Sequence, residues 1–253
     1  MSTTKSPPNE LTALLAALDK TGPEALTSCP GWTVHHTAAH ICGNYEEIEQ
    51  HVRAFAEARP LEQTRSWEER EQPLRELDLA TLLDRIEDQA WTVAAVIGPV
   101  LDEQPEAELT WTGRRVRVAG FPTHLRSEDA LHRWDIMGDD ETSQELLSQQ
   151  DLLDHAVSFI GLPLLRRGLA SAAGPGPFLA RVRSEGRDDL IVEASNGEAH
   201  LGLAPREGPP TIYGDPAARL LLLWGRKPQP FYRLRAGHDP SAAHRARALL
   251  AGY

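Results

Sequence analysis

The sequence predicts a protein of two parts, a helical bundle over residues 1–150 and a small α+β domain over residues 151–253. In the first part apolar residues recur every three or four positions, the period of an amphipathic helix. In the second part apolar and polar residues alternate around turn residues, which indicates strands. The charge divides in the same way, since residues 1–150 contain 13 Lys and Arg against 27 Asp and Glu, and residues 151–253 contain 13 against 10. The predicted fold class is therefore α plus α+β.

Four helical segments with one long connection predict a bundle in the first part. We expect these helices over residues 10–21, 33–58, 79–97 and 122–137. Gly22-Pro23, Pro60 and Gly98-Pro99 are expected to end the first three, because proline cannot continue a helix. Residues 61–78 are charged and irregular, and the acidic run EEREQPLRELD within them is typical of a solvated loop. Residues 108–121 alternate weakly around a glycine and predict a short hairpin.

The second part begins with a helix over residues 150–170, and the sequence AGPGP that follows is a plausible joint. FLARVRSEG and DLIVEASNGEAHLGL predict strands, with Asn196-Gly197 as a hairpin turn. GDPAARLLLLWGR then predicts a capped apolar helix. A strand in FYRLRAG and a last helix in SAAHRARALLAG complete the domain.

Composition excludes several classes of function. The chain has 253 residues and a net charge of −11, so it has no basic field that would attract nucleic acid. No apolar run approaches the roughly 20 residues of a membrane span, and the first ten residues do not resemble a signal peptide. The two cysteines, Cys29 and Cys42, are too few for a disulfide framework and are expected to be small buried residues. We expect a cytoplasmic protein that binds neither nucleic acid nor membrane, with a monomer favoured.

The stretch SEDALHRWD is a candidate functional segment, because it places Glu128 and His132 four residues apart on a predicted helix. Positions i and i+4 lie one above the other, so the two heads can converge on a metal ion. A plain surface contact between Glu128 and His132 explains the spacing equally simply. Other histidines and most tryptophans of the chain are expected to be surface residues and core anchors, respectively.

A catalytic metal needs a third ligand, and HHTAAH on the second predicted helix offers His35, His36 and His40. His40 lies on a face of small residues that allows another helix to approach, so His40 is the preferred third ligand. The alternative is that His36 and His40, also four residues apart, pair with each other.

Three segments of the chain resemble a known family. CPGWTVHHTAAHICGN and SEDALHRWDIMG resemble the two signature segments of the mycothiol-dependent maleylpyruvate isomerases, a branch of the DinB-like metalloenzyme superfamily. YGDPAARLLLLWGR is similar to the C-terminal domain of that family, which resembles sterol carrier proteins. The resemblance implies a DinB-like four-helix bundle followed by a sterol-carrier-like α+β domain, with metal ligands at His40, Glu128 and His132.

The resemblance also implies the chemistry. A divalent metal, zinc by preference, would deprotonate the thiol of mycothiol, the cofactor or co-substrate. The thiolate would add to the cis double bond of maleylpyruvate, and rotation and loss of the thiol would leave the trans isomer. A related S-transferase would attach the thiol to another electrophile. Asp135 would orient an imidazole, unless it is a plain surface carboxylate, and Arg226 would bind a substrate carboxylate, unless it is a solvated helix-end charge.

Two other interpretations of the function stay open. In one, the protein is a non-catalytic small-molecule binding protein with a sterol-carrier-like pocket, whose metal is structural or absent. In the other, it senses thiol status, although no DNA-binding motif supports that role. Three ligands of mixed His and Glu type favour catalysis, because structural zinc usually takes four.

Overall fold

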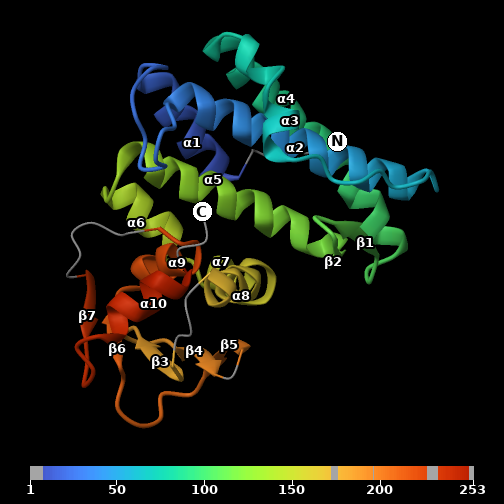
Figure 1. Cartoon of the computed structure of the whole chain (residues 1–253). Coiled ribbons are helices and arrows are strands. Elements are labelled where there is room, and N and C mark those ends of the chain that lie inside the picture. Colours follow the sequence, from blue (N-terminus) through green and yellow to red (C-terminus); the bar gives the residue numbers. More distant parts are fainter. Residues whose placement is uncertain (1–7, 172–175, 196, 227–232, 251–253) are drawn as a thin grey trace. The chain divides into compact units, whose positions relative to one another are not determined.

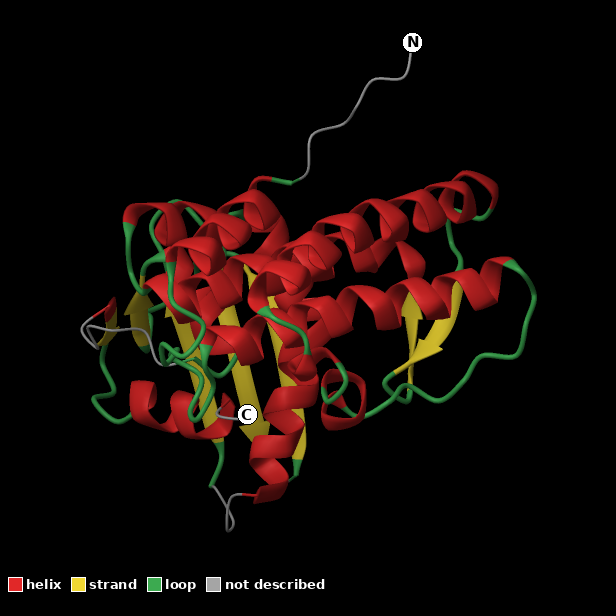
Figure 2. Cartoon of the chain, turned by 90° about the horizontal axis from the view of Figure 1, so that it is seen from above, coloured by secondary structure: helices red, strands yellow, loops and turns green. Residues whose placement is uncertain are grey.

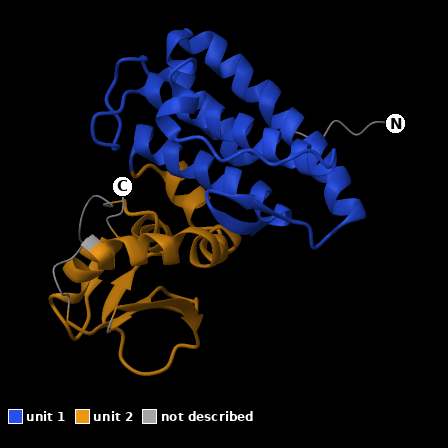
Figure 3. Ribbon diagram, turned by 45° about the vertical axis from the view of Figure 1, so that its right-hand side comes forward, with its two compact units in different colours: residues 1–138 blue, residues 139–253 orange. Residues whose placement is uncertain are grey.

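A computed structural model of the chain describes residues 8–171, 176–195, 197–226 and 233–250. It forms two compact units, unit 1 over Met1–Gly138 and unit 2 over Asp139–Tyr253 (Figure 3). The helical first unit and the mixed second unit confirm the predicted fold class. The domain boundary at residue 150 stays a prediction.

Unit 1 is built on long helices (Figure 1). These are α1 (Asn9–Lys20), α2 (Val34–Ala56), α4 (Leu79–Glu103) and α5 (Phe121–Met137). α2 packs on α4, α1 packs on α5, and α2 also contacts α5. The shorter elements are α3 (Trp67–Glu71), two 3-10 turns at Leu74–Glu76 and Val118–Gly120, and the antiparallel strands β1 (Glu108–Trp111) and β2 (Arg114–Arg117).

A buried polar pair joins α2 to α5. Tyr45 Oη of α2 donates a hydrogen bond of 2.7 Å to Asp129 Oδ2 of α5. Burial raises the pKa of Asp129 to about 8, although the bond from Tyr45 acts in the opposite direction. The pair therefore holds together the two helices that carry the predicted metal ligands.

Two predictions for unit 1 were wrong. The third predicted helix does not end at Gly98-Pro99, since α4 continues to Glu103 with Pro99 inside it. The clash that normally keeps the residue before proline out of the helical region involves its Cβ, and Gly98 has none. The acidic run at residues 68–78 is not a solvated loop either, because it contains most of α3 and buries Arg70 and Glu71.

The predicted hairpin is confirmed as β1 and β2. Its two-residue turn, Thr112-Gly113, has positive φ at both positions, 51° and 73°. That is the pattern of a type I′ turn, whose twist matches that of the strands and which favours glycine.

Unit 2 combines a five-stranded sheet with helices (Figure 2). The strand order is β5-β4-β3-β6-β7, and every neighbouring pair is antiparallel except β3 and β6. The strands are β3 (Phe178–Arg183), β4 (Asp189–Ser195), β5 (Glu198–Ala204), β6 (Ile212–Gly214) and β7 (Leu234–Ala236). The helices are α6 (Glu141–Leu147), α7 (Gln150–His155), a π-helical segment (Ala156–Gly161), α8 (Leu162–Ser171), α9 (Pro216–Leu223) and α10 (Ala242–Leu250).

Alternation along the strands buries one face of this sheet. Phe178 and Val182 of β3 are buried, whereas Leu179 between them is 61% exposed. α8 and α10 contact strands of the sheet. Sequence patterning did not predict the short strand β6, and both the joint at residues 173–177, in large part, and Asn196 lie outside the described residues. In the part of the chain that the structure describes, no helix is both long and apolar enough to cross a membrane.

Candidate metal centre

Three side chains from two neighbouring helices meet in unit 1. His40 comes from α2, and Glu128 and His132 come from consecutive turns of α5. Glu128 Oε2 lies 3.8 Å from His40 Nε2 and 3.3 Å from His132 Nε2. One ligand atom from each residue lies within 4.8 Å of the other two. The structure thus brings together the three predicted ligands, and their metal binding stays a prediction.

The start of α2 explains which histidine reaches this cluster. Thr33 caps the helix, since its side chain accepts a bond from the N–H of His36 and its own N–H is donated to His36 Nδ1. His35 Nε2 lies 2.7 Å from the carbonyl oxygen of Leu77. His36 is therefore engaged in capping, and it does not pair with His40.

Both imidazoles of the cluster are braced by carboxylates at their other ring nitrogen. His40 Nδ1 lies 2.6 Å from Glu71 Oε1, and the Glu71 side chain is completely buried. His132 Nδ1 lies 3.0 Å from Asp135 Oδ2, an ion-pair distance without hydrogen-bond alignment, and Asp135 is also buried, so it is not a plain surface carboxylate. Metal-binding histidines characteristically have such a partner, which fixes the tautomer and the orientation of the ring. The sequence indicated Asp135 for this place and gave no sign of Glu71.

The charged groups of the cluster stabilise one another. Burial opposes ionisation of Glu128, but bonds to His132 and His40 outweigh it and hold the pKa of Glu128 well below its usual range. Burial also opposes protonation of His132, but the contacts with Asp135, Cys29 and Glu128 raise its pKa well above the usual value. A bound metal ion would replace the proton that gives His132 its positive charge, because histidines that bind a metal must be neutral.

The donor set fits a divalent metal. Zinc bonds of about 2.0–2.1 Å in a tetrahedron place neighbouring ligand atoms roughly 3.3 Å apart. The observed separations of 3.3 and 3.8 Å are of this size. Two imidazoles and one carboxylate leave a fourth position for a water or a thiol, which is the composition of catalytic zinc sites.

The two cysteines differ from each other. Cys42 is buried, and burial raises the pKa of its thiol to about 12, which agrees with the prediction of a small buried residue. Cys29 is only half-buried, and its Sγ lies 3.2 Å from Asp135 Oδ2. Cys29 therefore touches the carboxylate that braces His132, which contradicts the expectation of a buried apolar role.

Several histidines that were expected on the surface are buried, namely His51, His124 and His155, whereas His200, His238 and His244 are exposed. His124 matters for the site, since its Nε2 lies 3.6 Å from Glu128 Oε1. His124 precedes Glu128 by four residues, the same spacing that singled out His132. The spacing of His124 and Glu128 in the sequence is therefore a signal for this position as well.

Aromatic rings lie against the imidazoles. The Trp32 ring is parallel to that of His132 within 7° at a centroid distance of 6.1 Å, and it meets the His40 ring edge-on at 5.0 Å. Trp67 of α3 lies 5.9 Å from Trp32 and is 44% exposed. Neither tryptophan is a core anchor, contrary to expectation, because both belong to the surroundings of the cluster.

Comparison with known families assigns unit 1. The family model described as the mycothiol maleylpyruvate isomerase N-terminal domain matches residues 8–137. The chain belongs to this family. A comparison with curated proteins gives no match. Among solved structures, a mycothiol-dependent maleylpyruvate isomerase and a point mutant of such an enzyme each show 13% identity and a TM-score of 0.57, covering 86% of this chain and 85% of theirs.

The isomerase-family match ends one residue before unit 1 does, and it includes every residue of the cluster. Arg226 lies in unit 2, beyond the end of α9. Its backbone N–H donates to the carbonyl oxygen of Leu221, its Nη1 donates to that of Trp224 at 3.3 Å, and it is half-buried. A catalytic role of Arg226 stays a prediction.

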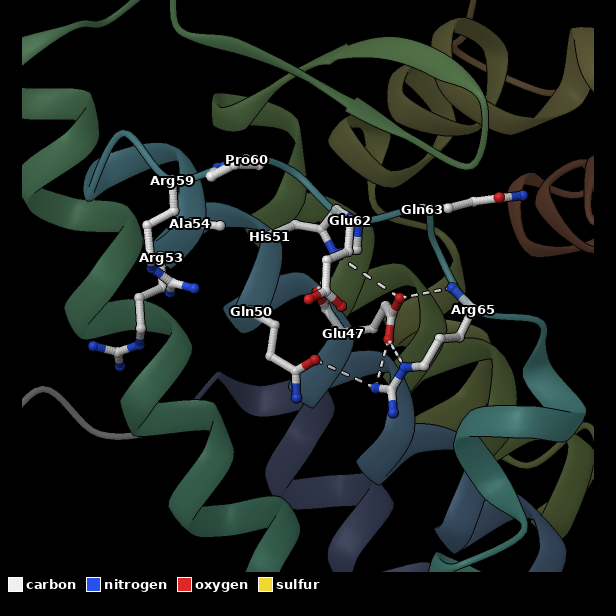
Figure 4. Close-up of a pocket in the computed structure, with 10 residues that line it drawn as sticks. All are labelled: Glu47, Gln50, His51, Arg53, Ala54, Arg59, Pro60, Glu62, Gln63 and Arg65. Atoms are coloured by element: carbon white, nitrogen blue, oxygen red, sulfur yellow. Dashed lines mark hydrogen bonds and ion pairs between the residues drawn. The ribbon is translucent and has the colours of Figure 1, made fainter.

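The isomerase-family domain also has a cavity of about 220 Å³ that is separate from the cluster (Figure 4). Polar and charged residues from the second half of α2 and from the chain beyond it line this cavity. Glu47 contributes to its wall and accepts bonds from the backbone N–H and the Nε of Arg65, at 2.9 and 2.8 Å. None of the three predicted ligands lines the cavity, so we place no chemistry there.

Proposed function

We propose that this protein is a metal-dependent enzyme that uses mycothiol as its nucleophile, either in a cis-trans isomerisation like that of maleylpyruvate or in the transfer of the thiol to another electrophile. The observation that carries the proposal is the convergence of His40, Glu128 and His132, with both imidazoles braced by buried carboxylates. Membership of the isomerase family supports the choice of thiol.

In this proposal His40, Glu128 and His132 hold a divalent metal, zinc by preference. When bound, such an ion lowers the pKa of a coordinating thiol and thereby supplies a thiolate at neutral pH. Nickel, iron or cobalt would accept the same donors, so the ligand types alone do not choose among these metals.

The residues around the ligands have separate tasks. Glu71 and Asp135 orient the two imidazoles through their Nδ1 atoms. Trp32 covers the rings of His40 and His132 and limits the access of water to them. The thiol and a small electrophilic substrate are the partners of this site.

Metal content measured by mass spectrometry of the purified protein is the first test, followed by titration of a cobalt-substituted sample with a small thiol. We expect one equivalent of metal and a thiolate-to-cobalt absorption band. His200→Ala, a change of an exposed histidine on β5, is the matched control and should alter neither. Absence of metal, or a metal spectrum that thiol does not change, would overturn the proposal.

Arg226 is proposed to bind a substrate carboxylate through its planar guanidinium. Arg226→Lys should then lower turnover of maleylpyruvate, about tenfold, while metal content stays at one equivalent. Kinetics identical to those of the unmodified enzyme would remove Arg226 from the mechanism.

A further inference from the structure

Arg70 of α3 lies in the interior of unit 1 and crosses α2 beside the candidate metal centre. A Cβ built on Gly43 would lie 3.3 Å from Arg70 Cγ and 3.4 Å from both Cδ and Nε. Gly43 follows His40 by three residues, so the two positions share a face of α2. The next residue of α3, Glu71, bonds to His40 itself. The side chain of Arg70 therefore runs one helical turn from a predicted ligand.

A glycine inside a helix is costly, and here it has a reason. Gly destabilises a helix interior relative to Ala. A Cβ at position 43 would lie a few tenths of an ångström too close to the stem of Arg70. Gly43 thus gives up helix stability and allows the Arg70 guanidinium to lie close to α2.

The three carboxylates that act electrostatically on Arg70 are already paired with other groups. Glu71 contacts His40 and Arg75, Glu47 contacts Arg65 (Figure 4), and Glu128 contacts His40 and His132. Within the described ranges of the chain, Arg70 makes no ion pair with any of them, and its buried Nε has no hydrogen-bond partner. Arg70 is only 8% exposed, and burial lowers its pKa despite these carboxylates.

A buried charge without a direct partner is unfavourable, so such a group gains strongly from an anion that arrives from outside. The guanidinium plane presents pairs of N–H groups that match the two oxygens of a carboxylate. Glu71, Glu128 and Glu47 favour the charged form of Arg70 from a distance, but an uncharged ligand would offer its guanidinium no carboxylate to pair with directly.

We propose that Arg70 binds a carboxylate of the electrophilic substrate and so selects acidic electrophiles at this centre. The assignment of that carboxylate to an electrophile rests on the proposed function, whereas the binding of a carboxylate by Arg70 does not. Arg70 is then a specificity-determining residue, distinct from Arg226 in unit 2.

The test is calorimetric titration of the full chain with maleate, a small cis-dicarboxylate, and with its uncharged dimethyl ester. We expect Arg70→Gln to weaken maleate binding about tenfold or more and Arg70→Lys to weaken it less. Neither change should affect the ester. Arg53→Gln, which removes an arginine paired with Glu49 on the surface of α2, is the matched control and should bind maleate normally.

Equal maleate affinity in the wild type and in Arg70→Gln would overturn the proposal, and so would a wild type that does not bind maleate. If Arg70→Gln does not fold, Arg70→Lys keeps the charge and most of the stem, and an unchanged affinity in that variant would overturn it equally. Each titration is made with zinc-loaded and with metal-free protein. A chain that takes up no zinc refutes the proposed function, while the metal-free titration still decides whether Arg70 binds a carboxylate.

Discussion

Both units bury charged side chains, but they do so in different ways. In unit 2, Asp189 is completely buried and accepts bonds of 2.8 and 2.6 Å from Arg183 and of 2.9 Å from Arg181. In unit 1, Glu128 faces two histidines whose remaining nitrogens are held by further carboxylates. The Asp189 carboxylate is fully engaged by two guanidinium groups, whereas the Glu128 cluster points several donor atoms at one place.

The difference separates a structural ion pair from a site. Groups that pair with each other use up their donors and acceptors, and the pair then contributes mainly to folding. Donor atoms that point at one place, on rings that other carboxylates orient, retain the capacity to bind an additional ion. The comparison therefore predicts that changes near Glu128 affect ligand binding and that changes near Asp189 affect stability.

The largest effect is expected from the loss of a ligand. His40→Ala and His132→Ala should each lower metal affinity by more than about 100-fold, because two donors remain where three are needed. Metal content after dialysis, measured by mass spectrometry, checks this, and circular dichroism checks that the fold is kept. Full metal occupancy in either variant would refute the ligand assignment.

Removing a carboxylate that braces a ligand should have a smaller effect. Glu71→Gln and Asp135→Asn are expected to reduce metal affinity about 10–100-fold, since the imidazoles lose their fixed orientation. Competition with a chromophoric chelator measures the affinity. Glu69→Gln, a change of an exposed residue on the same short helix, is the control for Glu71, and affinities that do not distinguish the two variants would speak against the bracing role.

The part of the site that lies on helices was predictable. Glu128 and His132 are four residues apart within one helix, so their convergence follows from helix geometry alone. His40 could be chosen because it lies on a face of small residues where a second helix can approach. The family resemblance and the spacing led to the same three residues.

Glu71 could not be predicted in this way. It lies 31 residues beyond His40 in a segment whose charges show no helical period, so only the tertiary fold brings the two together. Arg70 and Trp67 were missed for the same reason. The end of α4 was predicted too early because Gly98, which precedes Pro99, has no Cβ to clash with the proline ring.

For the Asp189 cluster of unit 2, the prediction concerns the free energy of unfolding. Burial disfavours the charged form of Asp189, but the bonds from Arg183 and Arg181 outweigh it and lower the pKa of Asp189. Asp189→Asn should lower the free energy of unfolding by about 2 kcal/mol at neutral pH. A carboxyl group whose pKa is lowered on folding stabilises fully above its unfolded pKa of about 3.9 and loses that contribution as the pH falls through the folded value.

The deficit of Asp189→Asn should therefore shrink in acid, because the wild type alone loses this stabilisation. Urea unfolding at neutral pH and near pH 3 measures the difference. Asp188→Asn, a change of the exposed neighbour, should be close to neutral at both. A deficit that stays constant between the two conditions would show that Asp189 does not act through its charge.

The smallest effect is expected in unit 1, from a substitution at Gly43. Gly43→Ala adds a methyl group 3.3–3.4 Å from the Arg70 stem, which is flexible enough to shift by a few tenths of an ångström. Ala favours the helix by up to about 1 kcal/mol, so the variant should unfold at slightly higher urea concentration than the wild type. If Arg70 binds a carboxylate, the same displacement should weaken maleate binding a few-fold and leave zinc content unchanged. A gain in stability with undiminished maleate binding would mean that Gly43 is not needed to position Arg70, and a loss of zinc would mean that the methyl group disturbs His40.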